Sequence, residues 1–118
     1  MKKLYNYNAH ITNVVDGDTV DATVDLGFNV QLKLRIRLAG INTPELKDKD
    51  LAIRAKAVAA KEALAGKILN RNIMLDSKGQ DKYGRWVGDI HLNDVYINDQ
   101  MKFEGYAVAY MEQGKIDK

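Results

Sequence analysis

Two neighbouring segments near the start of the chain alternate strictly between apolar and polar residues. Over residues 19–26 the aliphatic side chains fall on one face and the threonines and aspartates on the other. Over 30–38 aliphatic residues alternate in the same way with glutamine, lysine and arginine. A period of two predicts β-strands with one wet face, and the short connection 27–29 predicts an antiparallel hairpin. A shorter apolar-leaning strand, 10–15, precedes them and ends at an Asp-Gly turn.

After the loop 39–49 the period changes. Over 51–65 apolar residues recur at helical spacing among many alanines, which predicts an amphipathic helix with Asp50 as its N-cap. Another strand is expected over 72–75, followed by a turn-rich connection over 76–84.

The last third of the chain predicts two further strands and one short helix. The strands are expected over 86–92 and 95–97, with a hairpin turn between them. The helix is expected over 99–104, with Asn98 as N-cap and Gly105 at its end.

This order of elements predicts the fold class. Three strands, one main helix and then two or more strands indicate a mainly β, α+β protein. The expected architecture is a five-stranded oligonucleotide-binding (OB) barrel with a second, short helix. We see no internal boundary, so residues 1–118 are expected to form one domain, with a frayed polar tail over 112–118.

Composition excludes several kinds of site. The chain has no cysteine and two histidines, which rules out disulfides, thiolate zinc sites, cysteine nucleophiles and histidine-rich metal centres. The net charge of +2 allows a polyanionic partner without indicating one. No run is long enough to span a membrane, and residues 4–8 are too polar for a signal peptide. A cytoplasmic location is therefore the default expectation.

Candidate chemistry begins at the turn that contains Asp16 and Asp18. Taken alone, an Asp-Gly-Asp turn is more often only a polar turn, and the spacing of the following residues excludes an EF-hand. Asp18 is in register with the apolar face of the strand that follows it. A carboxylate there requires a cation or an arginine, and its hard oxygen atoms suit calcium or magnesium.

Three more charged positions are candidates. Arg37 ends the second strand of the hairpin, where it either belongs to a solvated basic face or binds an anion. Simple alternation does not bring it to Asp18, so a bulge or the strand end would have to redirect one of the two. Glu45 follows the chain's one proline in a loop, and Arg85 ends a charged glycine turn. Either could be an ordinary exposed residue.

Together these residues supply what phosphodiester hydrolysis requires. A carboxylate such as Glu45 can orient or deprotonate a water molecule. Asp18 and its neighbours can hold a divalent cation. The guanidinium groups of Arg37 and Arg85 can stabilise the charge that develops on the phosphate.

Three segments also resemble the motifs of the staphylococcal nuclease-like (thermonuclease) family. They are residues 15–20 (VDGDTV), Arg37 with 40–45 (GINTPE), and 81–85 (DKYGR). Their order and spacing match, and the resemblance extends over about residues 11–110. It implies an OB barrel with packed helices, and calcium-dependent cleavage of DNA and RNA, single strands favoured, with little sequence preference.

The resemblance also implies roles for individual residues. Glu45 would be the general base, and Arg37 and Arg85 would bind the scissile phosphate. The remaining assignments are calcium binding by Asp18, by Asp16 through water and by the carbonyl of Thr43, nucleotide phosphate contacts from Lys82 and Tyr83, and a base pocket at Tyr110.

The sequence departs from the family pattern at two places. Asn42 stands where the family usually has an aspartate that binds calcium; its amide oxygen still coordinates, but with a weaker affinity and room for other divalent metals. The chain also stops where the family continues into another helix, which suggests a protein partner or self-association. The alternative function is therefore a catalytically impaired barrel that binds nucleic acid or protein.

Overall fold

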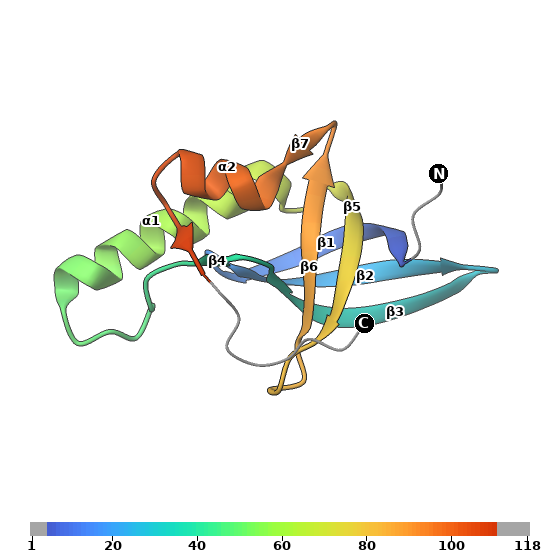
Figure 1. The fold of residues 1–118 in the computed structure, drawn as a ribbon, viewed down its shortest axis with the longest axis horizontal. Helices are drawn as coiled ribbons and strands as arrows, with labels where there is room; N and C mark the ends of the chain where they lie inside the picture. The colour runs from blue at the N-terminus through green and yellow to red at the C-terminus, as the bar shows by residue number, and fades with distance from the viewer. Residues whose placement is uncertain (1–4, 111–118) are drawn as a thin grey trace.

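The computed structural model describes residues 5–110 and shows a β-barrel with two helices packed on it (Figure 1). The frayed tail expected over 112–118 lies outside the described residues. The elements in chain order are β1 (Asn6–Asp16), β2 (Thr19–Gly27), β3 (Val30–Leu38), β4 (Ile41–Asn42), α1 (Leu51–Ile68), β5 (Asn72–Gln80), β6 (Trp86–Leu92), β7 (Val95–Tyr96), α2 (Ile97–Phe103) and β8 (Val108–Ala109).

Five of the strands close into a barrel, which confirms the predicted OB fold. Antiparallel pairs link β3 to β2, β2 to β1, β1 to β5 and β5 to β6. A short parallel pair then closes the ring, where Ile36–Leu38 of β3 lie beside Trp86–Gly88 of β6. Closure encloses the apolar faces of the strands within the ring, while the outer part of β3 keeps a free edge.

The core fills the barrel and extends under α1. The inward residues of β2 and β3 that alternation predicted, such as Val20, Val24 and Ile36, are fully buried. Helix α1 adds Ala60, Leu64 and other buried residues from one face. The side chain of Asp50 accepts a hydrogen bond from the N–H of Ala52, so the predicted N-cap is confirmed.

The β2–β3 hairpin was predicted closely, and it reaches well beyond the rest of the barrel. β3 pairs with β6 only through its last three residues. The other six residues of β3 pair with β2 alone, and Figure 1 shows the two strands projecting past β5 and β6. The outer half of this hairpin therefore has no strand beside it on the β3 side.

Two strands are longer than predicted. β1 begins at Asn6 instead of residue 10, and β5 continues to Gln80 instead of ending at residue 75. The added part of β1 pairs with β5, whereas the added part of β5 pairs with β6 across a bulge at Gly79. Polar residues made both extensions look like turns, and the long-range pairing overrides that local signal.

The predicted role of Asn98 was wrong. Helix α2 begins two residues earlier than predicted, at Ile97, and its N-cap is Tyr96 without a side-chain hydrogen bond. The Asn98 side chain is 1% exposed and faces the barrel, where it accepts from the N–H of Ile90 and donates to the carbonyls of Ala39 and Gly88. It ties α2 to β6 and to the end of β3.

Among the described residues, neither helix combines the length and the apolar character that a membrane crossing requires.

Candidate active site

The turn between β1 and β2 places two carboxylates together at the end of the barrel covered by α1. Asp18 is 7% exposed, and its Oδ2 accepts the N–H of Thr43 at 3.1 Å while its Oδ1 accepts the hydroxyl of Thr19 at 3.0 Å. The Oδ1 of Asp16 accepts the main-chain N–H of Asp18 at 3.1 Å. Asp18 thus joins the β1–β2 turn to the loop after β3.

The two carboxylates titrate as a pair. Burial, the hydrogen bond shared with Asp18 and the charge of Asp18 raise the pKa of Asp16 from 3.8 to about 6. Burial alone would also raise the pKa of Asp18. The hydrogen bond with Asp16, the charge of Arg37 and the bonds from Thr43 and Thr19 outweigh that effect and hold the pKa of Asp18 below its usual value. The negative charge therefore rests on Asp18, and Asp16 takes up the first proton.

The raised pKa of Asp16 predicts a pH-dependent effect on stability. The folded protein without metal favours protonated Asp16, so this contribution is present below pH 3.8 and is lost as the pH rises through about 6. Asn at position 16 keeps an oxygen acceptor and removes the charge. Because Asp16 is partly exposed, we expect Asp16→Asn to stabilise the protein in chelator by about 1–2 kcal/mol at neutral pH.

Urea unfolding of both proteins in chelator at neutral and acid pH measures this difference. The gain should disappear near the ordinary pKa of 3.8. An equal gain at both pH values would show that the Asp16 carboxylate does not titrate as described.

Arg37 is buried beside these carboxylates at the end of β3, with 6% exposure. Its Nη1 donates to the carbonyls of Leu38 and Ile41, each at 2.9 Å. Its Nη2 donates to the Oδ1 of Asn42 at 3.1 Å and lies 3.5 Å from the Oδ2 of Asp18. Tyr110 covers the guanidinium, with Cζ 5.0 Å from the ring centre.

Of the two explanations that the sequence left open, a bulge or the end of the strand, the end of β3 brings Arg37 to Asp18. Ile36, Arg37 and Leu38 are all buried, so alternation between a wet and a dry face stops there. The chain then turns through Gly40 to β4, whose two residues pair with β8. This return delivers Asn42, Thr43 and Tyr110 to the guanidinium and to Asp18.

Gly17 allows the β1–β2 turn to approach both α1 and the loop of Thr43. A Cβ atom at this position would lie 2.7 Å from the Cβ of Ala60 and 2.9 Å from the Cγ2 of Thr43. Both neighbours are buried, so neither can move away cheaply.

We expect Gly17→Ala to lower the free energy of unfolding by about 1–3 kcal/mol. Gly66→Ala is the matched control, because Gly66 lies in α1 with no atom within 4 Å of an added Cβ. That control should stabilise the protein by about 0.5–1 kcal/mol. Urea unfolding measures both variants, and a neutral Gly17→Ala would show that the turn has room to move.

A second group of charged residues lies in the turn between β5 and β6. Asp81 organises it by accepting the main-chain N–H groups of Tyr83 and Arg85 and, at 2.8 Å, the Nε–H of Arg85. The Lys82 Nζ and the Arg85 Cζ each lie 5.3 Å from the ring centre of Tyr83, which is 71% exposed. Among the described residues, the terminal nitrogens of Arg85 make no hydrogen bond.

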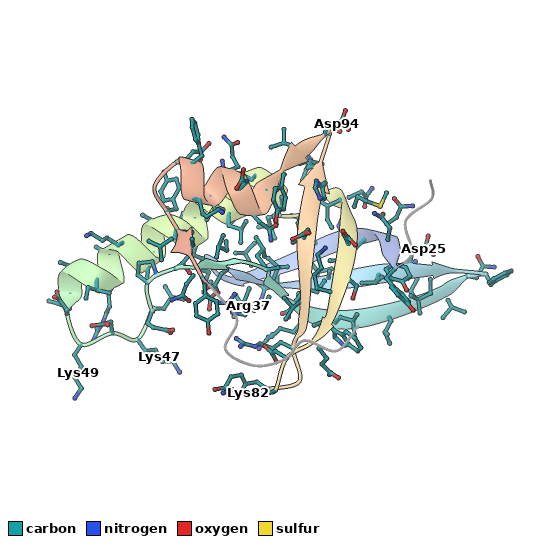
Figure 2. All side chains as sticks on the ribbon, in the orientation of Figure 1. Asp25, Arg37, Lys47, Lys49, Lys82 and Asp94 are labelled. Carbon is teal, nitrogen blue, oxygen red and sulfur yellow. The ribbon has the colours of Figure 1, made fainter. Side chains whose placement is uncertain are left out.

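The barrel closure brings these two groups near each other. Arg85 directly precedes Trp86, which pairs with Ile36, the neighbour of Arg37. Figure 2 shows Arg37 near the middle of the view, with Lys82 below it and Lys47 below it to the left.

Glu45 is not joined to the site by its side chain. It is exposed, its main-chain carbonyl accepts the N–H of Asp48, and its carboxylate makes no hydrogen bond or ion pair with any other residue of 5–110. Its predicted role as general base stays a prediction.

The residues at Asp18 suit a hard divalent cation by donor type. Asp16 and Asp18 supply carboxylate oxygens, and the Oδ1 of Asn42 lies close to Asp18 because both bind Nη2 of Arg37. A cation would also relieve the crowding of negative charge that raises the pKa of Asp16. Across residues 5–110, no cluster of three or more histidine, aspartate or glutamate side chains is present. By donor type these oxygens therefore suit a hard divalent cation, with one negative charge fewer than three carboxylates would supply.

The sequence analysis did not predict a role in the site for two polar residues, Thr19 and Asp81. The Thr19 hydroxyl donates to Asp18, although its position on the wet side of the alternation indicated an exposed residue. Asp81 fixes Arg85, and its place at the start of a glycine turn was a readable signal, because aspartate side chains there accept nearby main-chain N–H groups.

Comparison with known proteins places this arrangement in a family. The family model "Staphylococcal nuclease homologue" matches residues 35–118. Among similar curated proteins are Protein ParB of Escherichia coli, 31% identical over 89% of this chain, and Micrococcal nuclease of Shigella flexneri, 29% identical over 93%. Thermonuclease of Staphylococcus intermedius is 30% identical over 84% of this chain.

The chain spans between 57% and 62% of the length of these three relatives. The family match covers most of the chain, and it includes Arg37, the loop with Asn42 and the turn with Arg85. This chain therefore belongs to the staphylococcal nuclease homologue family.

Proposed function

We propose that this chain is a nuclease domain that hydrolyses phosphodiester bonds in DNA or RNA with calcium as cofactor. One observation carries the proposal: a buried arginine, Arg37, is held against an ionised aspartate, Asp18, and the turn that leads into the neighbouring strand β6 carries two more cations, Lys82 and Arg85. Family membership supports a nuclease-type function, and two of the relatives are named as nucleases.

The proposed reaction is attack of water on phosphorus. Glu45 orients the water and takes its proton, and the bond from phosphorus to the leaving oxygen breaks. Arg37 and Arg85 bind the phosphate oxygens and stabilise the added negative charge, and Arg85 also favours departure of the leaving oxygen. Calcium held by Asp18, Asp16, Asn42 and the carbonyl of Thr43 would supply further positive charge at the phosphate.

The surroundings of the site favour an exposed, single strand as substrate. Tyr83 is largely exposed and lies beside Lys82, so ring and ammonium together suit a nucleotide with its phosphate. Tyr110 lies over Arg37 and offers a second ring near the proposed scissile phosphate. Neither ring reads a base edge, which is consistent with little sequence preference.

The test is hydrolysis of a labelled single-stranded DNA by the purified chain in calcium, magnesium, manganese or chelator. We expect cleavage that requires calcium and stops in chelator. A folded protein that binds the strand and cleaves it with none of the three metals would contradict the proposal.

A binding module without catalysis is the second candidate, and two observations favour it. Asn42 removes one negative charge from the metal site, and the Glu45 carboxylate makes no contact with the other site residues. If the chain is such a module, single-stranded DNA would bind to it with similar affinity in calcium and in chelator.

Asn42→Asp tests the metal site directly. The added carboxylate should tighten calcium binding by about tenfold or more, because a charged ligand replaces a neutral one. Asn93→Asp is the matched control, since Asn93 is exposed in the β6–β7 turn, and it should leave the affinity unchanged. Calorimetric titration with calcium measures both, and an unchanged affinity in Asn42→Asp would remove position 42 from the metal site.

A further inference from the structure

The projecting end of the β2–β3 hairpin carries the apolar face of the barrel out into solvent. Leu26, Val30 and Leu32 lie on the face that farther down the strands forms the core, yet they are 41%, 50% and 46% exposed. Phe28, at the tip, is 100% exposed. We call these four residues the hairpin apolar face; within residues 5–110, no other part of the chain covers their exposed portions.

Turn chemistry does not account for the phenylalanine at the tip. Phe28 and Asn29 form a two-residue turn with φ of 55° and 64°. Such turns favour asparagine, aspartate or glycine, because a bulky side chain is strained at positive φ. A fully exposed aromatic ring in this conformation points to a contact outside the chain.

An apolar pocket adjoins this face, and its walls include Leu26 and Leu32 of the hairpin. It has a volume of about 140 Å³ and opens between the hairpin and the barrel, with Tyr7, Leu32, Leu34 and Trp86 among its walls. Cavities of roughly 150 Å³ with apolar walls hold a benzene ring. The pocket therefore has the size and the chemistry to accept a phenylalanine side chain.

The spacing of tip and pocket makes the face complementary to itself. Leu32 is four residues from Phe28 and four from Ile36, which pairs with Trp86 of the pocket wall. At about 3.3 Å per residue these two distances are each roughly 13 Å. If two hairpins pack face to face and antiparallel, with a two-fold axis at Leu32, each Phe28 lies over the pocket of the other copy.

We propose that the hairpin apolar face is a homodimer interface in which Phe28 of each copy fills the pocket of the other. The exposed parts of its four side chains amount to roughly 450 Å² per copy. Two copies would bury about 900 Å² before the pocket walls are counted, close to the lower limit for a specific interface.

Charge favours a second copy over a nucleic acid on this surface. Asp25 and Lys33 belong to the opposite, polar face of the hairpin, so pairing of the apolar faces buries neither. The pocket walls contain no lysine or arginine, which a nucleic-acid strand would require.

Sedimentation or light scattering of the wild type at micromolar concentrations is the first test. We expect a mass that rises with concentration to twice 13.3 kDa. Phe28→Asp should weaken the dimer about 30-fold or more, as expected for a central aromatic residue. Because Phe28 is fully exposed and its turn conformation favours aspartate, the replacement should not lower the unfolding temperature of the monomer.

Phe103→Asp is the matched control. Phe103 is 88% exposed on α2, away from the hairpin, and its replacement should leave the dimer intact. A dimer that survives Phe28→Asp, or that dissociates equally in Phe103→Asp, would overturn the proposal. So would a wild type that stays monomeric, which would assign the face to another segment of the chain or to a different protein.

The absence of cysteine from the sequence allows a second, independent test. A residue on a two-fold axis lies next to its own copy, so Leu32→Cys should form an intermolecular disulfide on mild oxidation. Val95→Cys, with a similarly exposed side chain on β7, should not. Equal cross-linking of both variants would indicate random collision and contradict the predicted axis.

Discussion

Glu45→Gln should lower the turnover of single-stranded DNA by about 10²–10⁴-fold, the usual contribution of a general base. The amide is nearly the same size as the carboxylate but cannot take a proton from water. Binding of the strand should change little, because Arg37, Lys82 and Arg85 make the proposed phosphate contacts and all three remain. The carboxylate has no partner within residues 5–110, so its loss should not affect stability.

The measurement is kcat and the dissociation constant for one labelled strand in calcium. Glu62→Gln is the control, because Glu62 is also an exposed glutamate, on the surface of α1. It should keep full turnover. If Glu45→Gln lost binding and turnover in equal measure, Glu45 would be a binding residue; if it lost neither, it would have no part in the reaction.

The side chain of Glu45 makes no polar contact within residues 5–110, whereas Arg37 and Asp18 are buried and hydrogen-bonded. Asp18 and Arg37 lie where the β1–β2 turn and the end of β3 are covered on both sides, so each is fixed by main-chain groups. Glu45 lies in the loop before α1 and owes its position only to main-chain turns. Phosphate binding would therefore act on a preformed arginine site, whereas a loop would bring in Glu45, the proposed base.

Much of this arrangement was readable from the sequence, because it depends on local patterns. The strict alternation over 19–26 and 30–38 gave the hairpin, and alanine-rich helical spacing after Asp50 gave α1. The order of these elements was enough to predict the barrel, because few folds contain three strands, then a helix, then two more strands.

Long-range contacts decided what the sequence could not show. The polar residues of 76–80 form a strand because β6 offers a partner. Asn98 turns inward because the main-chain carbonyls of Ala39 and Gly88 accept hydrogen bonds from its side chain. Arg37 is the clearest case. Its neighbours Lys33 and Arg35 lie on the solvent-exposed face that alternation predicts. Arg37 is buried instead, because β4 and Tyr110 cover it.

This difference between two arginines of one strand gives the second large prediction. Arg37→Lys should lower turnover about 100-fold or more and the free energy of unfolding by about 2–3 kcal/mol. Lysine keeps the charge but cannot bind two carbonyls and Asn42 at once from a planar group, as Arg37 does. It would leave buried acceptors without donors and the charge of Asp18 poorly matched.

Arg35→Lys is the control within the same strand. Arg35 is 54% exposed and pairs with Asp21 at 2.8 Å, and such surface pairs contribute about 0–1 kcal/mol. It should therefore change neither turnover nor stability by a measurable amount. Paired assays of DNA cleavage and urea unfolding test both variants. Equal, small effects at the two positions would show that only the charge of Arg37 matters, and that its planar hydrogen bonds do not define the site.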